Sequence, residues 1–320
     1  MELPLEPPKI PVCKHYGDVV RFNRLDSGPQ RCIGLFKAWA NLMRPDETDV
    51  FRMYLQDIWS EPDFGSICSG TDIPALVCRD FWNWALPHFN VGGKFSHRFS
   101  CEIDPKKRGF IHAVHKDCQA LFGDVVDLSE KQAWCFLEGK AKEVPEVKSM
   151  AAGFPCQDIS PLNPHSRSDT NRNCVANGTL RTGSVFGGIV GYLKKRRAPL
   201  QVCLMENVAS LAHQPKGGGP SNLDVVGSML SELGLHLHVW QLSPRLFGVP
   251  QSRSRVWMTV FSRTALQKAE MSKDCVTDTL NELMSTLTGW PENTIESYLV
   301  RPRTDCSQCF QLWLSELPGL

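Results

Sequence analysis

The chain has 320 residues, 42% of them apolar and 22% charged, with 24 Gly, 22 Pro and a net charge of +1. This composition argues against collagen-like, coiled-coil and wholly disordered chains, and no run of about 18 apolar residues predicts a membrane span. The charge is uneven, because residues 151–263 carry 12 Lys and Arg against 5 Asp and Glu, which suits a phosphate-bearing partner.

The length fits about two domains, or one large α/β domain with appendages. We expect residues 1–62 to form an N-terminal helical extension. Its Pro-rich start precedes a helical pattern in which Ile33, Phe36, Trp39 and Leu42 recur at three-residue spacing. A second apolar-periodic stretch covers residues 50–59, and packing on the main domain is its simplest role.

Residues 63–263 form the predicted catalytic segment. Seven short apolar runs alternate here with helical stretches, which predicts an α/β fold with a covered, largely parallel sheet. The runs are 64–68, 95–103, 120–122, 148–152, 201–205, 235–242 and 256–261. Ligands of such sheets bind beyond the carboxyl ends of the strands, so we expect functional residues directly after these runs.

The tail, residues 264–320, carries a helical pattern over 277–287 and a single Cys306-x-x-Cys309 pair. One such pair without a second favours two isolated thiols over a zinc site, and no metal site is expected. The 13 cysteines are odd in number and widely spread, which favours reduced thiols in a cytosolic or nuclear compartment.

The first three strand ends carry residues suited to a nucleoside. Ser69-Gly70-Thr71-Asp72 is a tight turn that lets a ligand approach the backbone, although a plain structural turn is equally compatible. Glu102 and Asp124 follow the next two runs, and a carboxylate at the second strand end commonly holds ribose hydroxyls. Each carboxylate taken singly could also cap a helix.

The sharpest signal follows the fourth run, in residues 151–160. Cys156 stands after Pro155 in a Gly/Pro turn, where a side chain is exposed and positioned as a nucleophile requires. A structural cysteine would more often lie inside the apolar run. The turn alone leaves the catalytic and structural interpretations about equal.

Four motifs together resemble those of the cytosine carbon-5 DNA methyltransferases. They are Gly153-Phe154-Pro155-Cys156-Gln157, the segment Arg181 to Phe186, Glu206-Asn207-Val208 and Gln251-Ser252-Arg253-Ser254-Arg255. Their order and spacing agree with the family over residues 64–263. The resemblance implies a Rossmann-like class I methyltransferase fold, with a mostly parallel seven-stranded sheet and helices on both faces.

The resemblance also implies the catalytic residues. Cys156 would attack carbon 6 of cytosine, and Glu206 would stabilise the charge that this attack creates at ring nitrogen 3. Arg253 and Arg255 would hold the carbonyl oxygen of the base and a nearby phosphate, with Arg255 favoured for the base. Surface ion pairs are the alternative role of the two arginines.

The implied cofactor is S-adenosyl-L-methionine. Its predicted contacts are Cys68, Ser69, Gly70, Thr71, Glu102, Ile103, Asp124, Val125, Phe154 and Pro155. Family members commonly read Phe-x-Gly-x-Gly-Gly in the cofactor turn, whereas this chain has Cys68 in place of the phenylalanine and Asp72 and Ile73 in place of two glycines.

The implied substrate is double-stranded DNA with a flipped-out target cytosine, contacted by Gln157, Ser160, Arg181 and Arg253. The residues after Arg255 show no match to the family's target-recognition domain. Three explanations stay open: the chain is a fragment, a second subunit supplies the missing parts, or the N-terminal helices substitute for some of them. Two alternatives stay open: a transfer-RNA methyltransferase, and a catalytically silent module that binds cofactor or DNA. We expect a nuclear protein if the source is eukaryotic and a cytoplasmic one otherwise, without a membrane.

Overall fold

The computed structural model describes residues 37, 40–41, 43, 45–268 and 272–288 of the chain. The helix predicted around residues 33–42 therefore lies largely outside the described residues. The Cys306-x-x-Cys309 pair lies wholly outside them.

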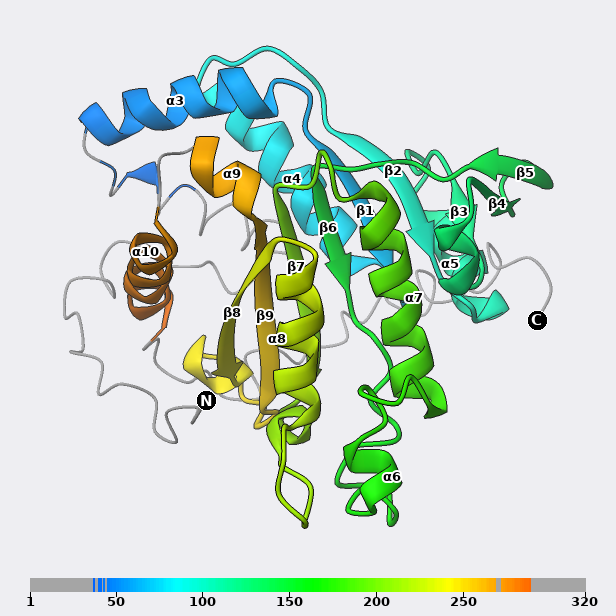
Figure 1. Ribbon diagram of the computed structural model, residues 1–320. Coiled ribbons are helices and arrows are strands. Elements are labelled where there is room, and N and C mark those ends of the chain that lie inside the picture. Colours follow the sequence, from blue (N-terminus) through cyan, green and yellow to red (C-terminus); the bar gives the residue numbers. More distant parts are fainter. Residues whose placement is uncertain (1–36, 38–39, 42, 44, 269–271, 289–320) are drawn as a thin grey trace, which may run out of the picture.

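A seven-stranded sheet forms the centre of the molecule, in the order β3-β2-β1-β6-β7-β9-β8 (Figure 1). The strands are β1 (Asp63–Ile67), β2 (Ser96–Cys101), β3 (Leu121–Phe122), β6 (Ser149–Ala152), β7 (Val202–Val208), β8 (Leu235–Leu242) and β9 (Arg255–Ser262). β9 runs antiparallel to both of its neighbours, whereas the other paired strands are parallel. The predicted α/β fold with a mostly parallel seven-stranded sheet is confirmed.

The strand order reverses between β1 and β6. The chain builds β1, β2 and β3 outward to one side, then returns to place β6 and β7 on the other side of β1. The crossover loops diverge at such a point and leave a crevice beyond the carboxyl ends of the two central strands. The turn after β1 and the turn after β6 therefore border the expected ligand site.

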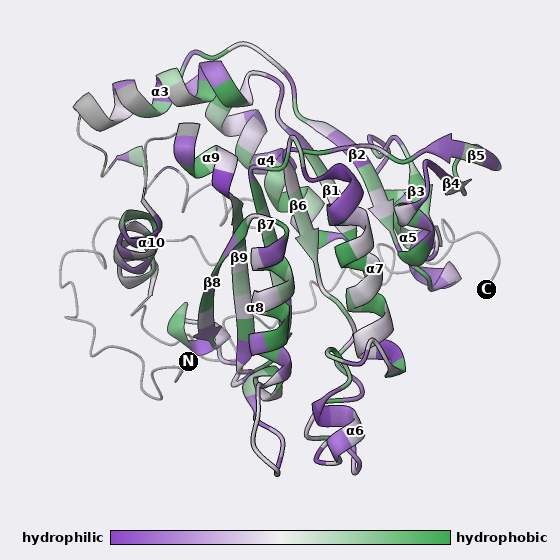
Figure 2. Ribbon diagram, in the orientation of Figure 1, coloured by the Kyte–Doolittle hydropathy of each residue, from purple (hydrophilic) through white to green (hydrophobic). Residues whose placement is uncertain are grey.

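Helices cover both faces of the sheet, as the sequence predicted (Figure 1). On one face, α3 (Pro45–Trp59) and α4 (Ile73–His88) share a core with Phe64 of β1. On the other, α7 (Leu180–Arg196) and α8 (Asn222–Glu232) share a core with Ile67 of the same strand. Successive strand side chains point to opposite faces, so β1 contributes to both cores. In Figure 2, apolar residues dominate the central strands and polar residues dominate α6 and the β5 tip.

The helical stretch predicted at residues 50–59 belongs to α3, which packs on the first of these cores. Leu55 and Trp59 are buried, and the Trp59 ring stacks on Trp82 of α4 at 5.1 Å between centroids. At the other end, α9 (Arg263–Lys268) and α10 (Lys273–Leu287) follow the sheet. α10 begins before the predicted residue 277, because Ser272 Oγ accepts the Cys275 N–H and caps the helix.

A hairpin of β4 (Gln132–Cys135) and β5 (Lys140–Glu143) was not predicted from the sequence. Its strands have four residues each, and only Ala133 and Cys135 are fully buried among them. The remaining helical segments are α5 (Pro105–Val114), α6 (Asp169–Arg172), η1 (Val126–Ser129), η2 (Ala209–Ala212) and η3 (Pro244–Leu246). None of the described helices has the length and apolar character needed to span a membrane.

The basic end of α7 has a structural role at one position. Arg196 is buried, and its guanidinium donates to the carbonyl oxygens of Val144, Leu128 and Glu130. These bonds join α7 to η1 and to the segment after β5. Arg196 is therefore a structural donor, whereas Lys194 and Lys195 are exposed.

Candidate active site

Three strands bring the predicted catalytic side chains together. Cys156 follows β6, Glu206 lies near the end of β7, and Arg255 begins β9. Val208 of β7 pairs with Arg255, which places Glu206, two residues earlier, diagonally beside Arg255 on one face of the sheet. Arg255 Nε donates to Glu206 Oε1 at 2.9 Å, and both side chains are partly exposed.

Hydrogen bonds fix the cysteine turn from two sides. Asn207 Nδ2 donates to the Phe154 carbonyl oxygen at 3.0 Å, which joins the turn to β7. Asp158 Oδ2 accepts the Thr182 N–H at 2.6 Å and so caps the start of α7, whose own N-cap Thr179 makes no side-chain bond. The backbone around Cys156 is therefore held before any ligand arrives.

Charges of both signs act on the Cys156 thiol. Burial of this half-buried group raises its pKa above the ordinary cysteine value, and the negative charge of Glu206 raises it further. The positive charges of Arg255 and Arg253 act on the same thiol and lower the pKa in part. The four predicted catalytic residues thus lie close enough to influence one another, and the thiol is mostly protonated at neutral pH.

This electrostatic arrangement predicts how alkylation of Cys156 depends on pH. Only the thiolate reacts, so iodoacetamide should modify Cys156 faster as the pH rises, with a midpoint above the ordinary cysteine range. Glu206→Gln should move the midpoint to lower pH, and Arg255→Gln should move it to higher pH. Peptide mass spectrometry measures both, with exposed Cys275 as the internal control for the reagent. A midpoint that neither substitution moves would contradict this electrostatic picture.

Asn207 should contribute to stability through the bond to Phe154. Asn207→Asp keeps the shape and the acceptor for the Val208 N–H but removes the donor, leaving two oxygens facing each other in a buried place. We expect the free energy of unfolding to fall by about 1–3 kcal/mol. Urea denaturation measures the loss, and the matched control Asn177→Asp, at an exposed position, should leave the midpoint unchanged. Equal midpoints for Asn207→Asp and the wild type would contradict the anchoring role.

The turn after β1 is shaped for close approach of a ligand. Gly70 has φ 59°, and a Cβ built there would meet no atom within 4 Å, so the backbone is open on that side. Glu102, at the end of β2, accepts the Gly70 N–H on Oε2 at 2.7 Å and the Asp104 N–H on Oε1 at 3.0 Å. One carboxylate thus joins two of the predicted cofactor segments. Each of its oxygens keeps a second lone pair for a hydroxyl donor.

Two residues by which this turn departs from the family's common sequence have a left-handed backbone. Asp72, where the family commonly has glycine, has φ 56°, and aspartate enters this left-handed region more readily than most residues. Cys68, where the family has phenylalanine, has φ 54°. Burial, together with the negative charge of Glu102, raises the pKa of the Cys68 thiol to about 12, so this side chain stays neutral and apolar.

The remaining predicted cofactor residues divide into accessible and buried side chains. Ile103 is 53% exposed, and Asp124 is exposed with Oδ1 accepting the Val126 N–H, so both can face a ligand. Val125 and Phe154 are buried, and their places among the predicted cofactor contacts stay a prediction. Val125 packs against Gly188 of α7, and the Phe154 ring lies 5.2 Å from that of Phe186.

The other residues of these turns are held by the scaffold. Ser69 Oγ accepts the Cys101 N–H and contacts Ser66 Oγ, so it turns inward from the predicted cofactor side. The Thr71 carbonyl oxygen contacts the His115 ring, and Pro155 is half-buried beside Cys156. The backbone of residues 69–71 thus remains the part that can meet a ligand.

The predicted nucleic-acid contacts lie at the outer side of the site. Gln157, Arg181 and Arg253 are exposed, and Ser160 is half-buried. The positive charge of Arg181 acts on Cys68 and that of Arg253 acts on Cys156. Arg181 therefore lies near the turn after β1, and Arg253 lies near the cysteine turn. Sequence reasoning did not assign Asp158 its role as the cap of α7. The sequence signal that could have indicated this role was the position of Asp158 directly after the cysteine motif.

Several known proteins are similar to this chain in sequence. DMT5, a DNA (cytosine-5-)-methyltransferase from Cryptococcus neoformans, is 28% identical over 194 residues, 60% of this chain and 7% of that protein. The type II methyltransferase M.MspI from Moraxella sp is 26% identical over 206 residues, 63% of this chain and 43% of that protein. This chain therefore spans less than half the length of either relative.

Among solved structures, S. pombe Dnmt2 methyltransferase aligns over 80% of this chain and 67% of its own, with 18% identity and a TM-score of 0.44. The profile of the family described as C-5 cytosine-specific DNA methylase matches residues 85–312, well over half of the chain, and continues beyond the sheet into the tail. The chain belongs to the C-5 cytosine-specific DNA methylase family.

Proposed function

We propose that this chain transfers a methyl group from S-adenosylmethionine to carbon 5 of a flipped-out cytosine in DNA, through a covalent adduct with Cys156. The observation that carries the proposal is the grouping of Cys156, Glu206, Arg253 and Arg255 beside the strand-order reversal. Family membership supports the same reaction on the same base.

The residues of the cofactor turns fit S-adenosylmethionine. Gly70 leaves its backbone open, the Glu102 carboxylate retains acceptor capacity for ribose hydroxyls, and Ile103 offers an exposed apolar surface for an aromatic base. Asp124 can accept from an amino group. When bound, the cofactor supplies an electrophilic methyl group, and these residues orient it toward the neighbouring cysteine turn.

The protein's own residues would make carbon 5 of cytosine reactive. The Cys156 thiolate adds to carbon 6, forming a sulfur–carbon bond and moving the electron pair of the ring double bond toward carbon 5 and nitrogen 3. Glu206 would take the proton that the Cys156 thiol gives up and share it with nitrogen 3, which stabilises this charge. Arg255, already oriented by Glu206, donates to the carbonyl oxygen of the base. After methylation, the carbon 5 proton would pass to solvent, and its bonding electron pair would re-form the carbon 5–carbon 6 double bond and expel the Cys156 thiolate.

The charges around Cys156 would couple formation of the thiolate to binding of the base. Free, the thiol is mostly protonated, because burial and Glu206 both raise its pKa. Once Glu206 engages nitrogen 3, its charge no longer opposes thiolate formation while Arg253 and Arg255 still favour it. Binding of the correct base would therefore activate the nucleophile.

The substrate is tested by methyl transfer to cytosine-containing duplex DNA and to structured RNA under the same conditions. We expect 5-methyldeoxycytidine in the digested DNA and no 5-methylcytidine in the RNA, detected by nucleoside mass spectrometry. Transfer to RNA alone would replace DNA by RNA as the substrate. No transfer to either, with cofactor binding intact, would favour a silent binding module. A second subunit for target recognition stays a prediction.

A further inference from the structure

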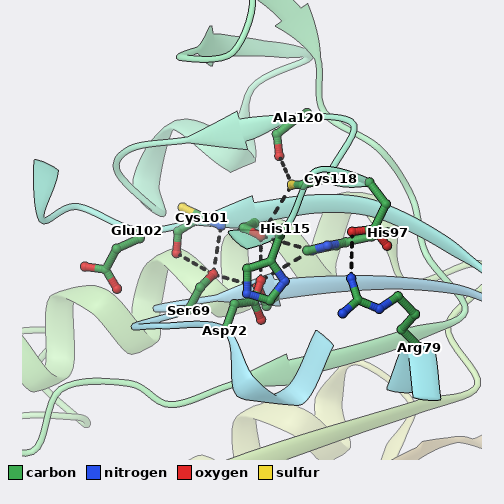
Figure 3. A network of polar contacts seen from close by, with 12 residues as sticks. Ser69, Asp72, Arg79, His97, Cys101, Glu102, His115, Cys118 and Ala120 are labelled. Atoms are coloured by element: carbon green, nitrogen blue, oxygen red, sulfur yellow. Dashed lines mark hydrogen bonds and ion pairs between the residues drawn. The ribbon is translucent and has the colours of Figure 1, made fainter. Parts of the chain in front are cut away.

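A network of buried hydrogen bonds holds the cofactor turn, residues 69–72, from inside the fold (Figure 3). Its centre is the Asp72 carboxylate, whose side chain is fully buried. Ser66 Oγ of β1 donates to Asp72 Oδ2 at 2.8 Å, and Ser100 Oγ of β2 donates to the same oxygen at 2.5 Å. Both serines are at most 1% exposed. Asp72 therefore joins the turn to two neighbouring strands.

His97 extends the network along β2. Ser100 has one hydroxyl hydrogen, and since that hydrogen goes to Asp72, the Ser100 oxygen accepts from His97 Nε2, 3.0 Å away. His97 is 1% exposed. The hydrogen on Nε2 is present in either charge state of the ring. The imidazole, the hydroxyl and the carboxylate thus form one directed chain of hydrogen bonds, in which each bond strengthens the next.

The backbone of the turn is held as well. The Asp72 N–H donates to the Ser69 carbonyl oxygen at 2.7 Å and closes the turn. The Thr71 carbonyl oxygen lies 3.0 Å from His115 Nε2, and since a carbonyl only accepts, the histidine is the donor. Gly70 keeps an open backbone on the side where a ligand can approach. The turn is thus fixed on its inner side and free on its outer side.

Asp72 adopts a backbone conformation that most side chains avoid. Its φ of 56° lies in the left-handed region, which glycine enters freely and aspartate enters at a cost. The family commonly has glycine at this position. A residue keeps such a conformation where the surrounding structure holds it, and such residues are typical of ligand-binding turns. The bonds from Ser66 and Ser100 provide that hold, and the N-terminus of α4, which Asp72 precedes, favours its negative charge.

We propose that Asp72 is a positioning residue for S-adenosylmethionine, because its bonds to Ser66 and Ser100 keep the turn in the conformation that presents the Gly70 backbone to the cofactor. The Asp72 side chain is buried, so it acts through the backbone of the turn and not by contact with the cofactor. The inference rests on the cofactor site of the proposed function and names the group that shapes this site from inside.

Calorimetric titration of the full chain with S-adenosylmethionine tests the proposal. Asp72→Gly tolerates the left-handed backbone but removes the carboxylate, and we expect its dissociation constant to rise at least about 10-fold. Asp72→Asn keeps an oxygen acceptor and also enters the left-handed region, so its dissociation constant should stay within about threefold of the wild-type value. Ser66→Ala removes one donor to Asp72 and should raise the constant at least about threefold.

Ser149→Ala is the matched control for Ser66→Ala. Ser149 begins β6, and its buried hydroxyl donates to the carbonyl oxygen of Asp63, the first residue of β1, at the end of the sheet away from the cofactor turn. Both variants lose one buried hydroxyl bond, so the midpoint of thermal unfolding should fall in both. The affinity for the cofactor should fall only in Ser66→Ala. A merely structural role of the network would lower the midpoint and leave the affinity unchanged.

Equal binding of the cofactor by Asp72→Gly and the wild type would overturn the proposal, and so would equal weakening in Asp72→Asn and Asp72→Gly. Weaker binding by Ser149→Ala would assign the effect to stability and would overturn it as well. If Asp72→Gly does not fold by circular dichroism, Ser66→Ala decides, and wild-type affinity in that variant contradicts the positioning role. A wild type that does not bind the cofactor would overturn the proposed function together with this inference. Methyl transfer is not the readout, so the inference can fail while the proposed function stands.

Discussion

Cys156→Ala should lower the rate of methyl transfer by at least about four orders of magnitude while leaving cofactor binding within about twofold. Carbon 5 of cytosine is a poor nucleophile until a thiolate adds to carbon 6, and no other described side chain in the site offers a sulfur close to Glu206 and Arg255. Cys68 does not substitute, because burial raises the pKa of its thiol to about 12.

Single-turnover kinetics with duplex DNA measure the rate, and calorimetry measures cofactor affinity. Cys275→Ser, at an exposed position on α10, is the matched control and should retain the wild-type rate. A Cys156→Ala enzyme within about tenfold of the wild type would remove the covalent step from the mechanism. A large loss of cofactor affinity would instead indicate that the substitution disturbs the turn.

Glu206→Gln should lower the rate by about 10²–10³-fold, the usual cost of losing one stabilising group for a developing charge. A second effect opposes this loss. Without the carboxylate charge the pKa of Cys156 falls, and one pKa unit raises the thiolate fraction at most about tenfold. The stabilising role of Glu206 is the larger effect, so we expect a net loss at neutral pH.

The pH dependence separates the two effects. The rate of Glu206→Gln should reach its plateau at a lower pH than that of the wild type, and the plateau itself should be lower. Glu232→Gln, at an exposed position on α8, should change neither. A plateau equal to that of the wild type would mean that Glu206 acts only on the charge of the thiol.

The sheet was predictable because its strands are short apolar runs, and all seven predicted runs correspond to strands. Their ends were less clear. The run 201–205 continues as β7 to Val208, because Glu206 and Asn207 extend the pairing with β9 although they are polar. The β4–β5 hairpin escaped prediction, since its four-residue strands have no sustained apolar pattern.

The catalytic residues could be predicted because each stands in a local motif at a strand end. The direction in which individual side chains point could not be predicted. The packing of Val125 and Phe154 against α7, for example, was not visible from the sequence. The contacts of Asp72 with Ser100 and of Thr71 with His115 depend on the pairing of β1 with β2 and on the return of the chain after α5. Contacts between separate segments leave no recognisable pattern within any single segment of the sequence.

The central claim is the covalent bond between Cys156 and carbon 6 of cytosine, and a duplex with 5-fluorocytosine tests it most directly. Fluorine replaces the proton that must leave carbon 5, so the adduct cannot resolve. We predict a cofactor-dependent protein–DNA complex that survives denaturing electrophoresis, maps to the Cys156 peptide, and forms in Cys275→Ser but not in Cys156→Ala. No complex with the wild type, or a complex that persists in Cys156→Ala, would contradict the account.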